Sequence, residues 1–286
     1  MFLMGHESNQ EDGTGVTVIL APDGAIGGVS VRGAAPGTRE TDLLRPGNTV
    51  QEAHAVVLTG GSAFGLEACN GVMAYLHEQG HGFKAGCFNV PIVAGAVLFD
   101  LGYKNFAYPD KSMGYKAAQN AGPISLQSGS IGVGTGATIG KILGPELAGK
   151  GGLGMATTQI GDAYITAVIG VNAIGDIYEG EQKIAGIQHE KSVMELLLQN
   201  AKTVPLSGQN TTIGCVLTNA VLSKEEANRL ADIAHDGLAL AIRPVHTMMD
   251  GDTMFALSES TTQIEFLTLQ AACVETVRHA VINAVK

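Results

Sequence analysis

A hydroxyl residue between a turn-rich segment and an apolar run could act as a nucleophile. Thr211 follows segment 204–210, which is rich in turn formers and is expected to be an exposed loop, and it begins the β-branched run 211–217. Cleavage of the bond between Asn210 and Thr211 would give Thr211 a free α-amine, which can act as the base for its own hydroxyl. The same pattern is typical of an ordinary turn exit before a strand, so both interpretations stay open.

Two neighbouring carboxylates are the second candidate for chemistry. Asp250 and Asp252 flank Gly251 in the strand-like run 250–258. Alternate residues of a strand face the same side, and two like charges side by side need a cation, a proton or a reaction to justify them. The alternative is a solvated turn with no catalytic role.

The sequence contains a zinc-protease motif, but not within the unbroken helix that this motif requires. Residues 77–81 read His-Glu-Gln-Gly-His, a literal HExxH motif, in which His77 and His81 would bind zinc and Glu78 would act as base. That arrangement needs an unbroken helix, whereas Gly80 is expected to end the helix. No third ligand is evident, so we expect no metal site.

Three glycine-rich or serine motifs also depart from their patterns. Residues 144–151 fit GxxxxGK, but Gly151 replaces the hydroxyl residue that would hold magnesium. Residues 132–137 fit GxGxxA, yet no βαβ repeat follows and Leu153 stands about 20 residues on, where an acidic residue is required. The GxSxG elbow of serine hydrolases is absent around Ser62 and Ser130. We expect no nucleotide cofactor.

Alternating and helical periodicities predict the elements that must position these residues. The first two predicted strands should form a hairpin with its turn at Pro22-Asp23-Gly24, and a second hairpin should turn at Gly161-Asp162. A capping box at Ser223 to Glu226 marks the start of one helix. The predicted strands are 15–22, 26–33, 54–59, 128–134, 152–159, 163–172, 211–217 and 250–258, and the predicted helices are 64–79, 190–201, 223–242 and 262–286. This order predicts one α+β domain with helices packed on stacked sheets.

Composition excludes several classes of protein. The chain has 286 residues, of which 45% are hydrophobic and 15% charged, so it can fill a core and is not disordered. The net charge of −10 and the absence of a basic run argue against a nucleic-acid partner. The 4 cysteines are widely spaced, which indicates buried reduced thiols and a cytoplasmic location. With no signal sequence and no apolar run long enough to cross a bilayer, we expect no membrane association.

Five motifs in a fixed order carry a resemblance that spans essentially the whole chain. They are GTRETD at 37–42, LTGGSAFGL at 58–66, VPIV at 90–93, VNAIGD at 171–176 and NTT at 210–212. Together they resemble the DmpA/NylC family of L-aminopeptidase D-amidase/esterases, β-peptidyl aminopeptidases and 6-aminohexanoate-oligomer endohydrolases. The resemblance implies an αββα four-layer sandwich like that of N-terminal-nucleophile hydrolases and of ornithine acetyltransferase, in one catalytic domain, 1–286, that cuts itself once into 1–210 and 211–286.

The resemblance also assigns roles to residues. It makes Thr211 the nucleophile and Asn210-Thr211 the processing site, and it matches Asp250 and Asp252 with the pair that orients the ammonium and hydroxyl of the nucleophile. Asn172 matches the residue that holds the substrate carbonyl or its oxyanion, and Lys141 matches a lysine that offsets the carboxylate charge. Aminopeptidase members carry Ser-x-Glu where this chain has Asp250-Gly251-Asp252, and they use serine as the nucleophile.

The activity implied is hydrolysis of amide bonds in small peptides or ω-amino-acid oligomers, without a cofactor or metal, by a cytoplasmic homo-oligomer that the family resemblance makes a tetramer. Three alternatives stay open at this stage. The first is an ornithine-acetyltransferase-like enzyme, which also exposes a threonine but passes the acyl group to an amine. The others are an HExxH zinc protease and a non-enzymatic assembly protein.

Overall fold

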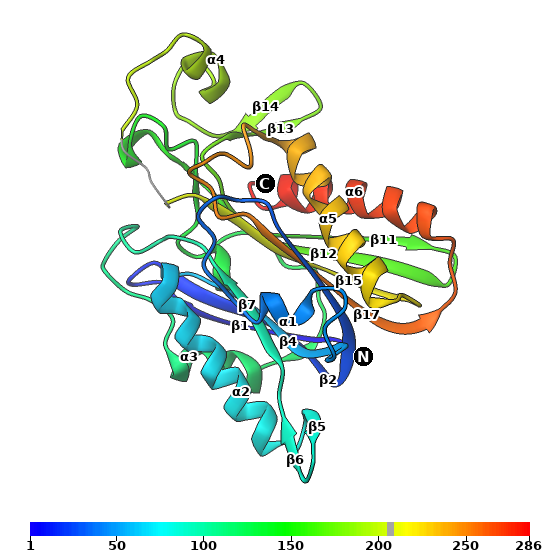
Figure 1. Cartoon of the computed structure of the whole chain (residues 1–286). Helices are drawn as coiled ribbons and strands as arrows, with labels where there is room; N and C mark the ends of the chain where they lie inside the picture. The colour runs from blue at the N-terminus through cyan, green and yellow to red at the C-terminus, as the bar shows by residue number, and fades with distance from the viewer. Residues whose placement is uncertain (205–208) are drawn as a thin grey trace.

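The computed structural model describes residues 1–204 and 209–286 (Figure 1). The strands are β1 (Leu3–Asn9), β2 (Thr14–Val31), β3 (Thr38–Arg39), β4 (Glu52–Thr59), β5 (Phe83–Ala85), β6 (Phe88–Val90), β7 (Val93–Val97), β8 (Gly122–Pro123), β9 (Thr138–Ile139), β10 (Gly149–Lys150), β11 (Gly152–Ile160), β12 (Ala163–Asn172), β13 (Asp176–Glu179), β14 (Gln182–Ala185), β15 (Thr211–Ala220), β16 (Ile242–Arg243) and β17 (Thr253–Thr262). The helices are α1 (Thr41–Leu44), α2 (Ala68–Glu78), α3 (Lys111–Gln119), α4 (Val193–Leu198), α5 (Lys224–Ala241) and α6 (Phe266–Asn283), with 3-10 turns η1 (Ser62–Glu67), η2 (Gly132–Gly134) and η3 (Pro145–Leu147).

The main sheet has two parts that meet at β2. Its strand order is β11-β12-β15-β17-β2-β4-β7-β3, with β1 also paired to β2. The first half of β2 lies between β1 and β4, and its second half lies along β17. One long strand therefore passes from one part of the sheet to the other.

Alternating side chains place the two parts of the sheet face to face. On β15, Val216 joins the apolar cluster of α5 and α6, whereas Cys215 and Leu217 join a central cluster with β4 and β7. On β4, Leu58 belongs to that central cluster and Val57 packs with α2 and α3. The layers are thus helices, sheet, sheet, helices, as the ribbon also shows (Figure 1), which confirms the predicted αββα sandwich.

Several predicted elements are confirmed where the local signal and the fold agree. The hairpin of β11 and β12 turns at Gly161, whose φ of 59° suits a glycine. The buried strands β4 and β15 lie where the apolar runs predicted them. Helix α5 begins with the predicted capping box, in which Ser223 and Glu226 each bond the other's backbone nitrogen.

The predicted hairpin at 15–33 is wrong. Residues 14–31 form the single strand β2, and the register of its pairing with β4 shifts around Pro22-Asp23-Gly24 instead of the chain turning there. The chain keeps its direction because β4 pairs with both halves of the strand and β17 continues along the second half. Local turn chemistry was overridden by the neighbours on both sides.

Other predicted boundaries also need correction. The segment 128–134 contains the 3-10 turn η2 instead of a strand, because Gly129 and Gly132 have positive φ values of 107° and 52°. The segment 64–79 begins as η1 before α2, and the segment 190–201 contains only α4. Helix α6 starts after Glu265 because β17 extends to Thr262. Among the predicted buried cysteines, Cys87 is exposed.

No helix in the described ranges is both long enough and apolar enough to span a bilayer.

Candidate active site

The fold brings the two predicted chemical segments to the same place. Strand β15 begins at Thr211, which pairs with Asn172 at the end of β12. On its other side β15 runs parallel to β17, and just before these strands Asn210 forms an isolated bridge with Asp250. Thr211 and Asp250 are therefore neighbours although they are far apart in sequence. Segment 205–208 of the predicted exposed loop lies outside the described residues, whereas Asn210 is fully buried.

The carbonyl of Asn210 is held by two donors. The Thr211 hydroxyl Oγ1 lies 2.5 Å from this carbonyl oxygen, and the backbone N–H of Gly251 donates to the same oxygen at 3.0 Å. Thr211 is only 3% exposed. In this uncleaved chain the hydroxyl is thus beside the bond that it would attack, and a backbone donor is already directed at the oxygen that would become negative.

Gly251 is a site residue that sequence reasoning missed. A Cβ atom at this position would lie 2.5 Å from the Ala35 carbonyl oxygen and 2.9 Å from Thr211 Oγ1. Only glycine therefore lets segment 250–252 approach Thr211 this closely. The available signal was the glycine between two aspartates, but its meaning depends on Ala35, which is distant in sequence.

The two carboxylates are buried and hydrogen-bonded, so the solvated-turn interpretation is wrong. Asp250 and Asp252 are each 1% exposed. Asp250 Oδ2 accepts from the backbone nitrogen and hydroxyl of Thr247 at 2.8 and 2.6 Å, and Asp252 Oδ1 accepts from the Thr212 nitrogen at 2.6 Å. Burial, and then the charge of Asp252, raise the pKa of Asp250 to about 6. Neither carboxylate has a hydrogen bond to the Thr211 hydroxyl within the described ranges.

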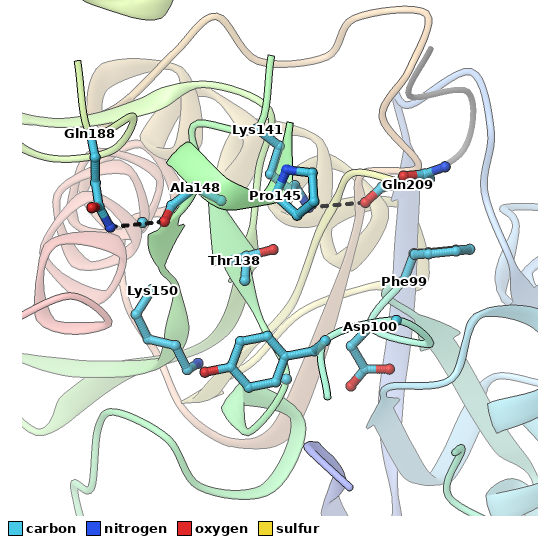
Figure 2. Close-up of a pocket in the computed structure, with 13 residues that line it drawn as sticks. Phe99, Asp100, Thr138, Lys141, Pro145, Ala148, Lys150, Gln188 and Gln209 are labelled. Carbon is cyan, nitrogen blue, oxygen red and sulfur yellow. Dashed lines mark hydrogen bonds between the residues drawn. The ribbon is translucent and has the colours of Figure 1, made fainter. Parts of the chain in front are cut away.

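Lys141 and Asn172 form a second group around the carbonyl of Gln209. Lys141 Nζ donates to Asn172 Oδ1 and to the Gln209 oxygen, both at 2.9 Å. Figure 2 shows the second of these contacts. Asn172 Nδ2 donates to the same Gln209 oxygen at 3.4 Å. Burial lowers the pKa of Lys141 to about 7, against the opposing influence of Asp250 and Asp100. These two side chains therefore contact the carbonyl one residue before that of Asn210.

Two cavities border this arrangement, and Phe99 lines both. The smaller, of about 220 Å³, reaches Thr211 and is otherwise lined by uncharged residues. The larger, of about 500 Å³, is drawn in Figure 2 and is lined by Lys141, Gln209, Asp100 and Lys150 among others. Asp100 is held by the Thr14 hydroxyl and the Gly61 nitrogen, and burial raises its pKa to about 6. One residue of each candidate group, Thr211 or Lys141, thus lines a cavity.

The two histidines of the HExxH motif do not lie on one unbroken helix. Helix α2 ends at Glu78, and Gly80 has a φ of 78°, which confirms the helix end predicted between His77 and His81. The Glu78 carboxylate accepts a hydrogen bond from the Tyr115 hydroxyl at 2.6 Å. Over the part of the chain that the structure describes, no three His, Cys, Asp or Glu side chains are grouped to hold a metal.

The lysine of the GxxxxGK motif is also engaged elsewhere. Lys150 Nζ donates to the backbone carbonyls of Gly134, Ala137 and Gly151 at 2.8 to 3.0 Å. Strand β11 follows it, whereas a phosphate-binding loop leads into a helix.

Comparison with known proteins gives consistent matches. A model of peptidase family S58 matches residues 3–286. The chain is 42% identical over 269 residues to a protein named as an uncharacterized aminopeptidase from Mycobacterium leprae (strain TN), covering 85% of this chain and 70% of that protein. It is 33% identical over 268 residues to a 6-aminohexanoate-oligomer endohydrolase from Kocuria sp. (strain KY2), covering 89% and 72%.

Solved structures share the fold. The L-aminopeptidase D-Ala-esterase/amidase from Ochrobactrum anthropi, described as a variant of the Ntn hydrolase fold, superposes with a TM-score of 0.75 at 19% identity, covering 99% of this chain and 83% of that one. A Burkholderia sp. beta-aminopeptidase gives a TM-score of 0.71 at 20% identity, with the same coverage.

Proposed function

The chain belongs to peptidase family S58 and is a hydrolase of amide bonds, and from this premise we propose that Thr211 is its nucleophile, exposed by self-cleavage after Asn210. The observation that carries the proposal is the contact of Thr211 Oγ1 and the Gly251 N–H with the Asn210 carbonyl oxygen. Cleavage would produce the pieces 1–210 and 211–286. Measuring self-cleavage and amide hydrolysis for Thr211→Ala beside the wild-type chain tests the proposal.

Self-cleavage begins with attack of Thr211 Oγ1 on the Asn210 carbonyl carbon. A C–O bond forms, the C–N bond breaks, and the hydroxyl proton passes to the departing nitrogen. Water then hydrolyses the resulting ester, which leaves a carboxylate on Asn210 and a free hydroxyl and α-amine on Thr211. During both steps the Gly251 N–H stabilises the negative oxygen, and loss of one such donor typically costs about 3 kcal/mol.

In the mature enzyme the same threonine would act on amide substrates. Its α-amine, with a reference pKa of about 7.7 to 8.0, serves as the base for its own hydroxyl. Asp250 and Asp252 orient the α-amine and the hydroxyl, and Lys141 offsets the negative charge of the two aspartates. Because Lys141 and Asn172 contact the Gln209 carbonyl in the uncleaved chain, we assign them to the substrate carbonyl that lies one residue before the carbonyl under attack. The substrates proposed are small peptides or ω-amino-acid oligomers.

A cytoplasmic location and a homo-oligomeric, tetrameric state belong to the same proposal. Free cysteines support the first, and the family resemblance supports the second. Light scattering on the purified protein tests the second, and a monomer would refute it.

Self-cleavage should depend on pH through Asp250 and Lys141. Because the pKa of Asp250 is raised to about 6, this carboxylate loses its charge as the pH falls through that value. Because the pKa of Lys141 is lowered to about 7, its ammonium loses its proton as the pH rises through that value. The rate should therefore fall on both sides of the interval between them. Gel analysis of the freshly synthesised chain measures the rate of self-cleavage at each pH, and circular dichroism verifies that the chain is folded. A rate that stays constant from acid to alkaline pH would contradict the roles of Asp250 and Lys141.

Gly251→Ala should slow self-cleavage by about 10² or more, because the new methyl group would push the backbone donor away from Asn210. Gly122→Ala is the matched control, since a Cβ atom there meets nothing within 4 Å. Timed gels on both variants give the rates. Equal rates for the two alanine variants would remove Gly251 from the mechanism.

A further inference from the structure

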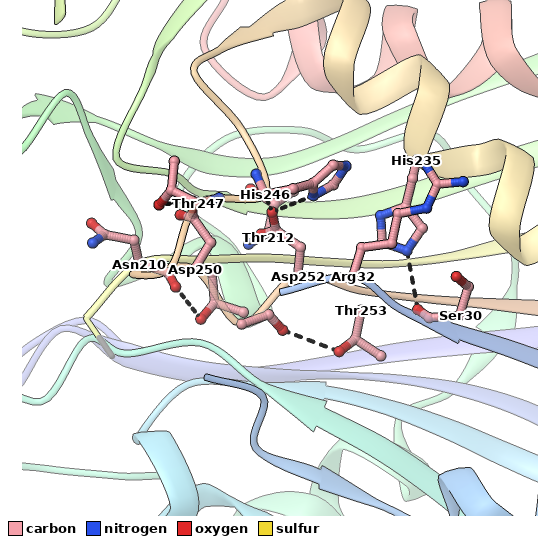
Figure 3. Close-up of polar contacts among 12 residues, drawn as sticks. Ser30, Arg32, Asn210, Thr212, His235, His246, Thr247, Asp250, Asp252 and Thr253 are labelled. Atoms are coloured by element: carbon pink, nitrogen blue, oxygen red, sulfur yellow. Dashed lines mark hydrogen bonds and ion pairs between the residues drawn. The ribbon is translucent and has the colours of Figure 1, made fainter. Parts of the chain in front are cut away.

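A pair of histidines, His235 fully buried and His246 partly buried, lies beside the carboxylates of the candidate site and has no part in the chemistry described so far (Figure 3). His246 is in the segment between β16 and β17, four residues before Asp250, and its φ of 58° is positive. Its ring Nδ1 is 2.7 Å from Asp252 Oδ2, and its backbone nitrogen donates to the same oxygen at 3.1 Å. The other oxygen of Asp252 accepts from the Thr212 nitrogen. Asp252 therefore connects His246 to the backbone next to the nucleophile.

The partner atoms determine which ring nitrogen carries hydrogen. An ionised carboxylate only accepts hydrogen bonds, so His246 Nδ1 must be the donor to Asp252, whether the ring is neutral or charged. His246 Nε2 is buried and has no hydrogen-bond partner within residues 1–204 and 209–286. A buried polar atom without a partner requires an explanation, and here the explanation is that the opposite side of the ring is committed to Asp252.

His235 of α5 packs against the ring of His246. Its ring centroid is 4.7 Å from that of His246, with the planes at 73°. His235 Nε2 is 3.1 Å from the Ser30 carbonyl oxygen and must donate to it, which leaves Nδ1 as an acceptor without a partner in the described ranges. The ring is fully buried, and burial lowers the pKa of His235 to about 4, so it is neutral near pH 7.

The other charged groups near the pair have hydrogen-bond or ion-pair partners of their own. On the side of β2, Arg32 is paired with Asp232 and Asp236 of α5 at 2.7 and 3.3 Å. On the side of the active site, Asp250 accepts two hydrogen bonds from Thr247. Asp252 is thus the carboxylate to which the His246 ring is bound.

We propose that His246 is a positioning residue of this active site: its Nδ1–H fixes the Asp252 carboxylate, which in turn fixes the Thr212 amide and the start of the strand that carries Thr211. The inference rests on the proposed function, because it assigns His246 a role only if Thr211 is the nucleophile. His246 lines neither of the two cavities that border Thr211 and Lys141, so its loss should change the rate of reaction and leave substrate binding nearly unchanged.

Two amide variants separate this role from simple filling of space. In His246→Asn the side-chain nitrogen is as many bonds from Cα as Nδ1, so it can still donate to Asp252. In His246→Gln the nitrogen is one bond further out, at the level of Nε2, so that donor is displaced. His246→Asn should self-cleave and turn over within about threefold of the wild type, whereas His246→Gln should be slower in self-cleavage and in kcat by about 10- to 100-fold, with KM within about twofold.

The results that would overturn the role of His246 differ from those that would overturn the proposed function. Wild-type rates for His246→Gln, or equal slowing of both variants, would overturn the positioning role while Thr211→Ala remains inactive. Cleavage by Thr211→Ala would overturn the proposed function itself. If the His246 variants do not fold, nitrogen-15 NMR of histidine-labelled Thr211→Ala protein decides the question: hydrogen on Nδ1 of His246 supports the role, and hydrogen on Nε2 alone overturns it.

Discussion

Thr211→Ala should remain one 286-residue polypeptide and should lose amide hydrolysis by at least about 10⁴-fold. Alanine has no hydroxyl to attack the Asn210 carbonyl, so the chain cannot be cut and no free α-amine is formed at position 211. The fold should persist, because the change removes one side-chain hydrogen bond and few packing contacts. Denaturing gels, circular dichroism and an amide-hydrolysis assay measure the three expectations.

Thr211→Ser is the matched control, because serine keeps the hydroxyl and loses only a methyl group. It should still cut itself and hydrolyse amides, and it should lose rate through poorer orientation of the hydroxyl rather than through loss of the nucleophile. Continued cleavage of Thr211→Ala at the same bond would remove Thr211 from its assigned role.

Asp250→Asn and Asp252→Asn should each slow self-cleavage or turnover by about 10² or more while the protein stays folded. Asparagine has nearly the same shape but lacks the negative charge, and its amide group adds donors where Thr247, Thr212 and His246 already donate. Self-cleavage is followed on gels, turnover by amide hydrolysis, and folding by thermal unfolding.

Asp162→Asn is the control for this pair, because Asp162 lies in the exposed turn between β11 and β12. Its change should alter the free energy of unfolding by about 0.5 kcal/mol or less and leave both rates unaltered. If the two active-site variants behaved like Asp162→Asn, the catalytic assignment of the aspartates would be wrong.

The sequence predicted best those elements whose local pattern agrees with their surroundings. The β-branched run after Asn210 forms the central strand β15, and the capping box at Ser223 starts α5. The hairpin turn predicted at Pro22 to Gly24 was wrong, because pairing with β4 and β17 keeps the chain extended there. A pattern of a few residues contains no information about strands that arrive from elsewhere in the chain.

Some residues of the candidate site could be identified from the sequence and others could not. Thr211, Asp250 and Asp252 were identifiable because residue type and spacing suggest a nucleophile and an acidic pair. Gly251 and His246 were not, since the role that we propose for Gly251 rests on its backbone N–H and the role that we propose for His246 rests on a side chain directed at Asp252. Their roles depend on distances between segments that only the folded sheet brings together.

N-terminal sequencing of the smaller fragment of the purified protein tests the central claim most directly. We expect two fragments on a denaturing gel and a smaller one that begins Thr-Thr-Ile-Gly-Cys, the sequence from Thr211 onward. The same preparation should hydrolyse a small amide substrate. A single uncleaved chain that hydrolyses the substrate at full rate, or a fragment that begins at any other residue, would contradict an N-terminal Thr211 nucleophile.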